Sequence, residues 1–237
     1  MKIVTAYFDY PGRNTYARCL RAFKASIVMS NPDAELQILE LEPPEPVEGA
    51  YQGWVNNHIK LHAYSQIPID QPTVFVDIDT IFLRDVSELF DKTFDVAIGQ
   101  RPHWGGRRVR YNGGVVLFKP TQAARRFMAW WSAIDGNMLE NQDLHMKWHV
   151  KYNGQNQASF GCMMELHSKK TRIHRYPTAV LNACEQDWPR ISENVPYILH
   201  VRKRLLKAAQ SPRPLSTIRK PLQAATKIWR YFETCDQ

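Results

Sequence analysis

Short apolar runs alternate with longer amphipathic segments along this chain of 237 residues. The apolar runs have the length of buried strands, and the segments between them repeat apolar residues every three or four positions, as helices do. Strands are predicted at 1–9, 35–41, 73–76, 94–99, 111–118 and 195–201, and helices at 14–29, 54–66, 121–131 and 140–150, with a short helix after 154–160. Strands that alternate with helices predict an α/β fold.

Two aspartates, Asp77 and Asp79, follow the apolar strand at 73–76. Alternate side chains of an extended backbone share a face, so the two carboxylates point one way and Ile78 points the other. Carboxylates in an apolar segment need a counter-charge or a metal, and Mg²⁺ or Mn²⁺ bound to a polyphosphate supplies one. Ligands of open α/β sheets bind at the carboxyl ends of strands. The pair therefore predicts a metal-phosphate site, with a turn or a helix cap as the alternative.

Adjacent glycines, Gly113 and Gly114, lie near the start of the strand at 111–118. Glycine costs conformational entropy in a strand, so its presence indicates either a close approach to the backbone or a β-bulge. The preceding loop at 100–108 carries three arginines and two further glycines. It is a candidate for holding phosphate or an acceptor, or else a mobile surface loop.

Composition and length fit one folded domain followed by a tail, with apolar residues at 44% and charged residues at 23%. The first nine residues resemble a strand rather than a signal peptide, and no apolar run reaches membrane-spanning length. Without an export signal, the four cysteines are expected to be reduced, and we expect a cytoplasmic protein, peripheral at most to the inner membrane face.

Charge is distributed unevenly. Residues 1–100 hold 8 basic and 14 acidic residues, which leaves 23 basic and 9 acidic residues in 101–237. From 202 to 230 nine basic residues occur without an acidic one, interleaved with aromatic and aliphatic residues. Such a segment favours a polyanion or an anionic membrane surface. The alternative is a solvated tail whose aromatic residues dock onto the domain.

The order of these features resembles one known family. A basic residue in a helix (Lys60), the Asp77-Ile78-Asp79 triplet, the strand 111–118, the amide pair Asn156-Gln157 and the late His200 are similar to the retaining nucleotide-sugar glycosyltransferases of family eight. The resemblance spans about residues 1–207 and leaves 208–237 as the basic, aromatic tail. It implies the GT-A fold, which has a mixed, mostly parallel sheet flanked by helices.

The resemblance also implies roles for individual residues. In that family two aspartates and a late histidine bind Mn²⁺, which holds the donor diphosphate; here they are Asp77, Asp79 and His200, with Mg²⁺ as the alternative ion. The donor contacts that it implies, together with those expected from the glycine strand and the triplet, are Thr5, Ala6, Tyr7, Lys60, Asp77, Ile78, Gly113, Gly114 and Lys207. The catalytic residues that we expect, near the sugar, are Asn112, Asn156 and Gln157.

Two segments depart from the family pattern. Relatives often carry Asp-Gln where this chain has Asn156-Gln157, so a neutral amide replaces a carboxylate that binds sugar hydroxyls. Relatives also carry Gly and Lys-Pro-Trp after the late histidine, whereas Val201 to Lys207 follow here. Lys207 is the candidate lysine for the diphosphate. We expect Gln157 to orient or stabilise a cationic sugar rather than to form a covalent bond.

The leading hypothesis is a metal-dependent transferase that moves a hexose or pentose from a nucleotide-diphosphate sugar to a hydroxyl acceptor. The basic C-terminal segment points to an anionic acceptor, either a membrane-associated glycolipid or lipopolysaccharide, or nucleic acid with a modified base. A non-catalytic nucleic-acid-binding protein on the same scaffold would explain the isoelectric point of about 9.3. A nucleotidyltransferase, which uses similar metal carboxylates, is the third possibility.

Overall fold

The computed structural model describes residues 1–8, 10, 14–45, 51–101, 110–152, 156–202 and 204–235. Its centre is a sheet of six strands in the order β2-β1-β3-β6-β5-β7, in which β6 is antiparallel to both neighbours and the other pairs are parallel. The strands are β1 (Lys2–Phe8), β2 (Glu35–Leu41), β3 (Thr73–Asp77), β5 (Val96–Gln100), β6 (Tyr111–Phe118) and β7 (Ile173–Pro177). The predicted α/β class, with a mixed and mostly parallel sheet, is confirmed.

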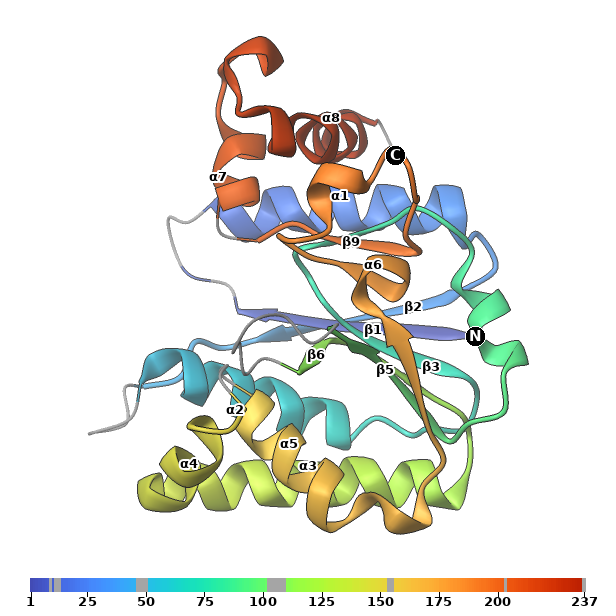
Figure 1. Cartoon of the computed structure of the whole chain (residues 1–237), viewed down its shortest axis with the longest axis vertical. Coiled ribbons are helices and arrows are strands. Elements are labelled where there is room, and N and C mark those ends of the chain that lie inside the picture. Colours follow the sequence, from blue (N-terminus) through green and yellow to red (C-terminus); the bar gives the residue numbers. More distant parts are fainter. Residues whose placement is uncertain are drawn as a thin grey trace.

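Helices cover both faces of this sheet (Figure 1). On one face lie α2 (Gln52–Ser65), α3 (Gln122–Glu140), α4 (Gln142–His149) and α5 (Gln157–Leu166). On the other lie α1 (Asn14–Ser30), α7 (Arg204–Gln210), α8 (Lys220–Thr234) and a small sheet of β4 (Thr80–Phe82), β9 (Ile198–His200) and β8 (Asn182–Ala183), which α6 (Thr178–Leu181) precedes.

Strand β6 shows how the sequence builds the two sides of the core. Its residues alternate, with Val116 and Phe118 in the apolar cluster under α3 and α5, and Val115 and Leu117 in the cluster under α1. All four are almost fully buried. A strand covered on both faces reads as a continuous apolar run, because both sides of the pleat face hydrocarbon.

The element prediction is confirmed for most of the chain, with differences at specific ends. The helix predicted at 121–131 continues to Glu140, and Thr121 caps it by accepting a hydrogen bond from the Ala124 amide (3.1 Å). The strand predicted at 195–201 shortens to β9. Strands β4, β7 and β8 and helices α6, α7 and α8 were not predicted from the pattern. Most of the arginine-rich loop at 100–108 lies outside the described residues.

The C-terminal segment docks onto the domain. Trp229 of α8 is 1% exposed in a third apolar cluster with Ala22 and Ala25 of α1. The Arg18 guanidinium lies over the Trp229 ring at 5.3 Å from its centroid, and its Nη2 donates to Glu233 (2.8 Å). Trp229 and Phe232 of this segment are therefore buried in the protein, whereas Tyr231 is exposed. The domain boundary expected after residue 207 falls within α7, and its position stays a prediction.

One buried carboxylate ties three elements together. Asp95, just before β5, accepts hydrogen bonds from the Arg172 backbone amide (2.8 Å), from its Nε (3.1 Å) and Nη2 (3.0 Å), and from the Thr121 hydroxyl (2.9 Å). The Arg172 hydrogen bonds outweigh the opposing effect of burial and lower the pKa of Asp95 to about 2. Arg172 and Thr121 lie before β7 and α3, so this carboxylate fixes how those elements meet the edge of the sheet.

Acid should remove the contribution of the Asp95 carboxylate to the unfolding free energy. Because the pKa of Asp95 is lower in the folded chain than the ordinary value near 4, its contribution is complete above pH about 4 and disappears as the pH falls toward 2. We expect the unfolding free energy of the parent to fall by about 2 kcal/mol more across that window than that of Asp95→Asn. Urea unfolding at several pH values measures this, with exposed Asp33→Asn as a control that keeps the parental slope.

Candidate donor and metal site

Three side chains converge where β3 leaves the large sheet. Asp77 ends β3, Asp79 lies in the bend before β4, and His200 ends β9, where it pairs with Thr80 of β4. One ligand atom from each of Asp77, Asp79 and His200 lies within 4.8 Å of the others. His200 Nε2 is 3.1 Å from Asp79 Oδ1 and 3.7 Å from Asp77 Oδ2. The structure thus brings together the three residues that the resemblance implied as metal ligands.

The geometry behind this convergence differs from the predicted one. Asp77 and Asp79 do not alternate along one extended strand, because the chain bends at Ile78 and passes from the large sheet to the small one. Ile78 is 5% exposed and lies in the core cluster under α1. Its side chain therefore faces away from both carboxylates, which leaves its backbone as the part available to a donor.

Opposite charges hold the cluster together. Burial disfavours a charged imidazole, but Asp79 outweighs it and raises the pKa of His200 to about 10. Burial likewise opposes ionisation of Asp79, yet His200 holds the pKa of that carboxyl below its ordinary value. The Lys60 ammonium pairs with Asp77 Oδ1, and this carboxylate keeps the pKa of the lysine above its usual range despite burial. Buried carboxylates need such partners, and a bound cation would supply the same compensation.

The three side chains of the cluster fit a divalent cation as metal ligands. The carboxylates of Asp77 and Asp79 and the imidazole of His200 are ligands that Mn²⁺ accepts, and the carboxylates also suit Mg²⁺. Behind the cluster, Asn182 Nδ2 is 3.4 Å from His200 Nδ1, while the Asn182 Oδ1 is buried without a hydrogen-bond partner among the described residues. A half-turn of this amide would let Oδ1 accept from a protonated Nδ1 and leave Nε2 free for the metal, the usual support of a metal-binding histidine.

The glycine pair of β6 leaves room beside the cluster. A Cβ on Gly114 would lie 2.5 Å from His200 Cε1 and 2.7 Å from Asp77 Oδ2, closer than real side chains approach. The nearest neighbour of a Cβ on Gly113 would be the Asn156 side chain, at 3.4 Å. Gly114 therefore lets the aspartate and the histidine reach across the strand. The register of β5 and β6 also shifts here: Ile98 pairs with Val116 and Gly99 with Asn112, so the unmatched residues lie in β6 and include the glycine pair.

Residues implied near the sugar lie around these glycines. Asn112 is buried; its Nδ2 donates to Cys184 Sγ (2.7 Å) and its Oδ1 accepts from the Gly114 amide (3.1 Å). Asn156 precedes α5 with its side chain against Gly113, and half-buried Gln157 is the first residue of that helix. Asn112 thus supports the glycine backbone through its side chain, whereas Asn156 and Gln157 lie at its edge.

The end of β1 lies next to the same bend. Ala6 pairs with Asp77 across the sheet. The Thr5 hydroxyl donates to the Val76 carbonyl (2.9 Å), and the Ala6 amide donates to the Tyr64 hydroxyl (3.1 Å). Because Thr5 and Ala6 are buried, half-buried Tyr7 is the most open of the three residues expected to cradle a nucleotide base.

Lys207 is not joined to this site. Its side chain is exposed on α7, and among the described residues no hydrogen bond or ion pair links it to the three-residue cluster. Its assignment as the diphosphate lysine gains no support from this position and stays a prediction.

Two arginines near the cluster were missed as site residues. Burial opposes ionisation of the Cys184 thiol, yet His200, Arg202 and Arg101 together lower its pKa, which shows that both guanidinium charges act at this point. The Nε atoms of Arg202 and Arg101 are buried and have no hydrogen-bond partner within the described part of the chain. Arg202 follows His200 by two positions, a spacing that would have identified it; Arg101 belongs to the loop already noted for its arginines.

Solved structures with low sequence identity share this architecture. The glycosyltransferase GlyE of Streptococcus pneumoniae TIGR4 superposes with a TM-score of 0.61 at 15% identity, covering 99% of this chain and 61% of that one. The galactosyltransferase LgtC, solved with donor and acceptor sugar analogues, gives 0.60 at 12% identity over 100% and 98%. A glycosyltransferase involved in glycosylation of the major capsid of PBCV-1 gives 0.57 at 13% over 98% and 99%. The chain therefore has the GT-A fold of glycosyltransferases.

The sequence comparison is more specific. The family model for nucleotide-diphospho-sugar transferases matches residues 68–204, more than half of the chain. This protein belongs to the nucleotide-diphospho-sugar transferase family. A search of curated proteins found no match. No helix among the described residues is both long enough and apolar enough to cross a membrane.

Proposed function

We propose that this protein is a divalent-metal-dependent glycosyltransferase that moves a sugar from a nucleotide-diphosphate sugar to a hydroxyl acceptor. The observation that carries the proposal is the convergence of Asp77, Asp79 and His200 within 4.8 Å at the carboxyl end of β3, beside the Gly114 backbone. Membership in the nucleotide-diphospho-sugar transferase family supports the donor class.

The charge that develops on the departing diphosphate suggests a role for each group of residues in the site. Asp77, Asp79 and His200 would hold Mn²⁺ or Mg²⁺, which when bound neutralises negative charge on the departing diphosphate. Arg202 and Arg101, whose Nε atoms lack hydrogen-bond partners among the described residues, would bind the phosphate oxygens through charge-assisted hydrogen bonds, which are strong. The end of β1 would receive the base, chiefly through Tyr7. The leaving diphosphate then needs no proton from the protein.

The sugar would lie over the strand β6. As the sugar–phosphate bond breaks, positive charge grows on the ring, and the neutral amides of Asn156 and Gln157 stabilise it through their carbonyl dipoles. Asn112 would hold the glycine backbone against the sugar through its bond to the Gly114 amide. We infer retention of the anomeric configuration from the resemblance to the retaining family-eight enzymes.

A donor screen tests the proposal. Purified chain is incubated with a panel of nucleotide-diphosphate sugars, with Mn²⁺, with Mg²⁺ or with chelator, and hydrolysis is followed by mass spectrometry. We expect one donor to yield free sugar and nucleoside diphosphate only when metal is present. Release of pyrophosphate from a nucleoside triphosphate would indicate a nucleotidyltransferase instead, and salt-sensitive DNA binding without any donor turnover would indicate a nucleic-acid-binding protein.

Arg202 should bind the diphosphate directly. We expect Arg202→Ala to weaken the binding of nucleoside diphosphates in the presence of Mn²⁺ by roughly 10- to 100-fold, the cost of losing a charge-assisted hydrogen bond. Arg202→Lys should recover part of this loss because it keeps the charge. Calorimetric titration measures the affinities, and Arg204→Ala, exposed two residues along the chain, should bind as the parent does. Unchanged affinity in Arg202→Ala would remove Arg202 from the site.

For the acceptor we propose a polyanion attracted by the C-terminal segment. Because Trp229 and Phe232 of α8 are buried, the exposed basic side chains, together with Tyr231, remain for this contact. An anionic glycan at the inner membrane face and nucleic acid are both compatible with such a surface. Binding of each acceptor class to the parent and to the double variant Lys220→Glu with Lys227→Glu distinguishes the two. The double variant should weaken the binding of the true acceptor class and leave the other unaffected.

A further inference from the structure

A hollow opens among the helices that cover one face of the large sheet. It has a volume of about 380 Å³, within the range of roughly 300–1,000 Å³ typical of small-molecule sites, and lies between α3, α5 and the 3₁₀ helix η2 (Ser168–Lys170). Leu166, at the far end of α5, follows Gln157 by nine residues, roughly 14 Å along the helix. The hollow is therefore separate from the metal cluster, which faces the opposite end of α5.

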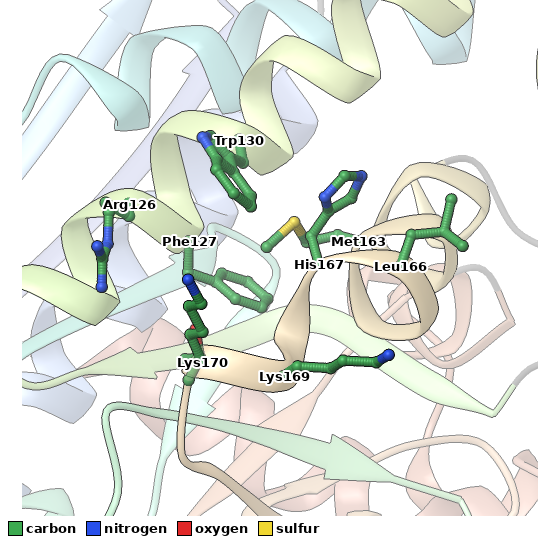
Figure 2. Close-up of a pocket in the computed structure, with 9 residues that line it drawn as sticks. Arg126, Phe127, Trp130, Met163, Leu166, His167, Lys169 and Lys170 are labelled. Atoms are coloured by element: carbon green, nitrogen blue, oxygen red, sulfur yellow. The ribbon is translucent and has the colours of Figure 1, made fainter.

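The interior of this hollow is apolar. Phe127 and Met163 form buried parts of it, whereas Trp130 and Leu166 lie partly in solvent, 49% and 58% exposed. Figure 2 shows Phe127, Trp130 and Met163 turned toward one space. Large apolar side chains exposed around a concave surface indicate a binding site, because filling the hollow removes their surface from water.

The rim of the hollow is positively charged. Arg126, Lys169 and Lys170 line it, and no acidic residue is among the lining side chains. Within the described chain these three cations form no ion pair, unlike neighbouring Arg172, which is paired with Asp95. Three uncompensated charges beside hydrocarbon favour a ligand with an anionic group on an apolar body.

The lining also narrows the ligand class. Apart from the three cations, the polar side chains among the lining residues are Thr171 and His167, and the His167 ring packs edge-on against Trp130, so a sugar in the interior would leave most of its hydroxyls without partners. A hydrocarbon chain has no polar groups that need hydrogen-bond partners. We propose that this hollow binds a phosphorylated lipid, with the chain against Phe127, Trp130 and Met163 and the phosphate at Lys170, whose side chain extends beside Phe127 (Figure 2).

Alkyl phosphates below their micelle concentration test the proposal, since they need neither metal nor sugar donor. Calorimetric titration with octyl, decyl and dodecyl phosphate should show affinity rising by roughly four-fold for each methylene that enters the hollow, until the hollow is filled. Octanol and inorganic phosphate, which supply one half of the ligand each, should bind far more weakly.

Variants locate the site. Lys170→Glu should lower the affinity for dodecyl phosphate at least about ten-fold, Lys170→Arg should keep it, and Trp130→Ala should flatten the dependence on chain length. Arg21→Glu makes the same charge change at an exposed position of α1, on the opposite face of the sheet, and should bind as the parent does (Figure 1).

Three results would overturn the proposal. Inorganic phosphate that binds as tightly as dodecyl phosphate would indicate an adventitious ion only, and octanol that binds as tightly would indicate a hollow with no use for its cations. Sedimentation that shows a dimer dissociated by Trp130→Ala would assign the surface to a second copy of this chain. A failed donor screen would leave the lipid proposal unaffected, because the two experiments share no reagent.

Discussion

Replacing Asp79 with asparagine should abolish metal binding and lower donor turnover by at least about 100-fold. The substitution keeps the shape of the side chain but removes one of two carboxylate ligands and the charge partner of His200. Loss of one principal electrostatic group in an active site costs about 10² to 10³ in rate. The loss should appear in kcat/KM for donor hydrolysis and in the electron paramagnetic resonance signal of Mn²⁺, which stays that of the free ion.

Asp33→Asn is the matched control for this experiment. Asp33 is exposed in the turn before β2, so the same chemical change there should leave Mn²⁺ binding and turnover at parental values. Thermal unfolding of both variants should show a cooperative transition, which establishes that they are folded. Parental turnover in a folded Asp79→Asn chain would refute the role of this carboxylate and, with it, the assignment of the three-residue cluster as the donor site.

Adding a single methyl group at Gly114 should be nearly as damaging. Its Cβ would fall 2.5 Å from the His200 ring and 2.7 Å from a carboxylate oxygen of Asp77, so both ligands must move. We expect Gly114→Ala to weaken Mn²⁺ binding and donor turnover by about 100-fold, because positioning errors of about 1 Å carry losses of that order. Forcing a group into a packed site also costs about 1–3 kcal/mol of unfolding free energy.

The neighbouring glycine supplies the control. Gly113→Ala makes the same addition one residue away, where the new Cβ would be at ordinary contact distance, 3.4 Å, from the Asn156 side chain. This variant should keep Mn²⁺ affinity, and its turnover should stay within a few-fold of the parent. Equal losses in both variants would mean that strand flexibility, rather than the close approach at Gly114, explains the glycine pair.

Regular elements were predictable where one pattern dominated locally. Strand β2 begins and ends at the predicted residues, and β6 was found because its apolar run reflects burial on both faces. Strand β7, Ile-His-Arg-Tyr-Pro, lies at the edge of the sheet with four of its five side chains partly or fully exposed, so its sequence lacks that run. Edge strands are set by pairing with a neighbour, which a local pattern does not record.

The position of the C-terminal segment was likewise not predictable from a local sequence pattern. Its basic and aromatic residues were compatible with a membrane surface, a polyanion or docking on the domain. The position of α1 decided where Trp229 lies: it packs with Ala22 and Ala25, and Arg18 contacts both its ring and Glu233. These partners are about 200 residues apart in the chain, a separation across which no sequence period applies.

By itself, the sequence determined the α/β class, the strand that ends in Asp77, the glycine pair that follows and the surplus of basic residues toward the C-terminus, because each depends on residues close together in the chain. The tertiary structure decided the rest. Pairing of β4 with β9 carries His200 across about 120 residues to Asp79, and it brings Arg202 near the same carboxylate. The hollow between α3 and α5 likewise exists only after packing. Side chains distant in the chain form a site once strand pairing and core packing have fixed their backbones, and those contacts follow from the whole fold.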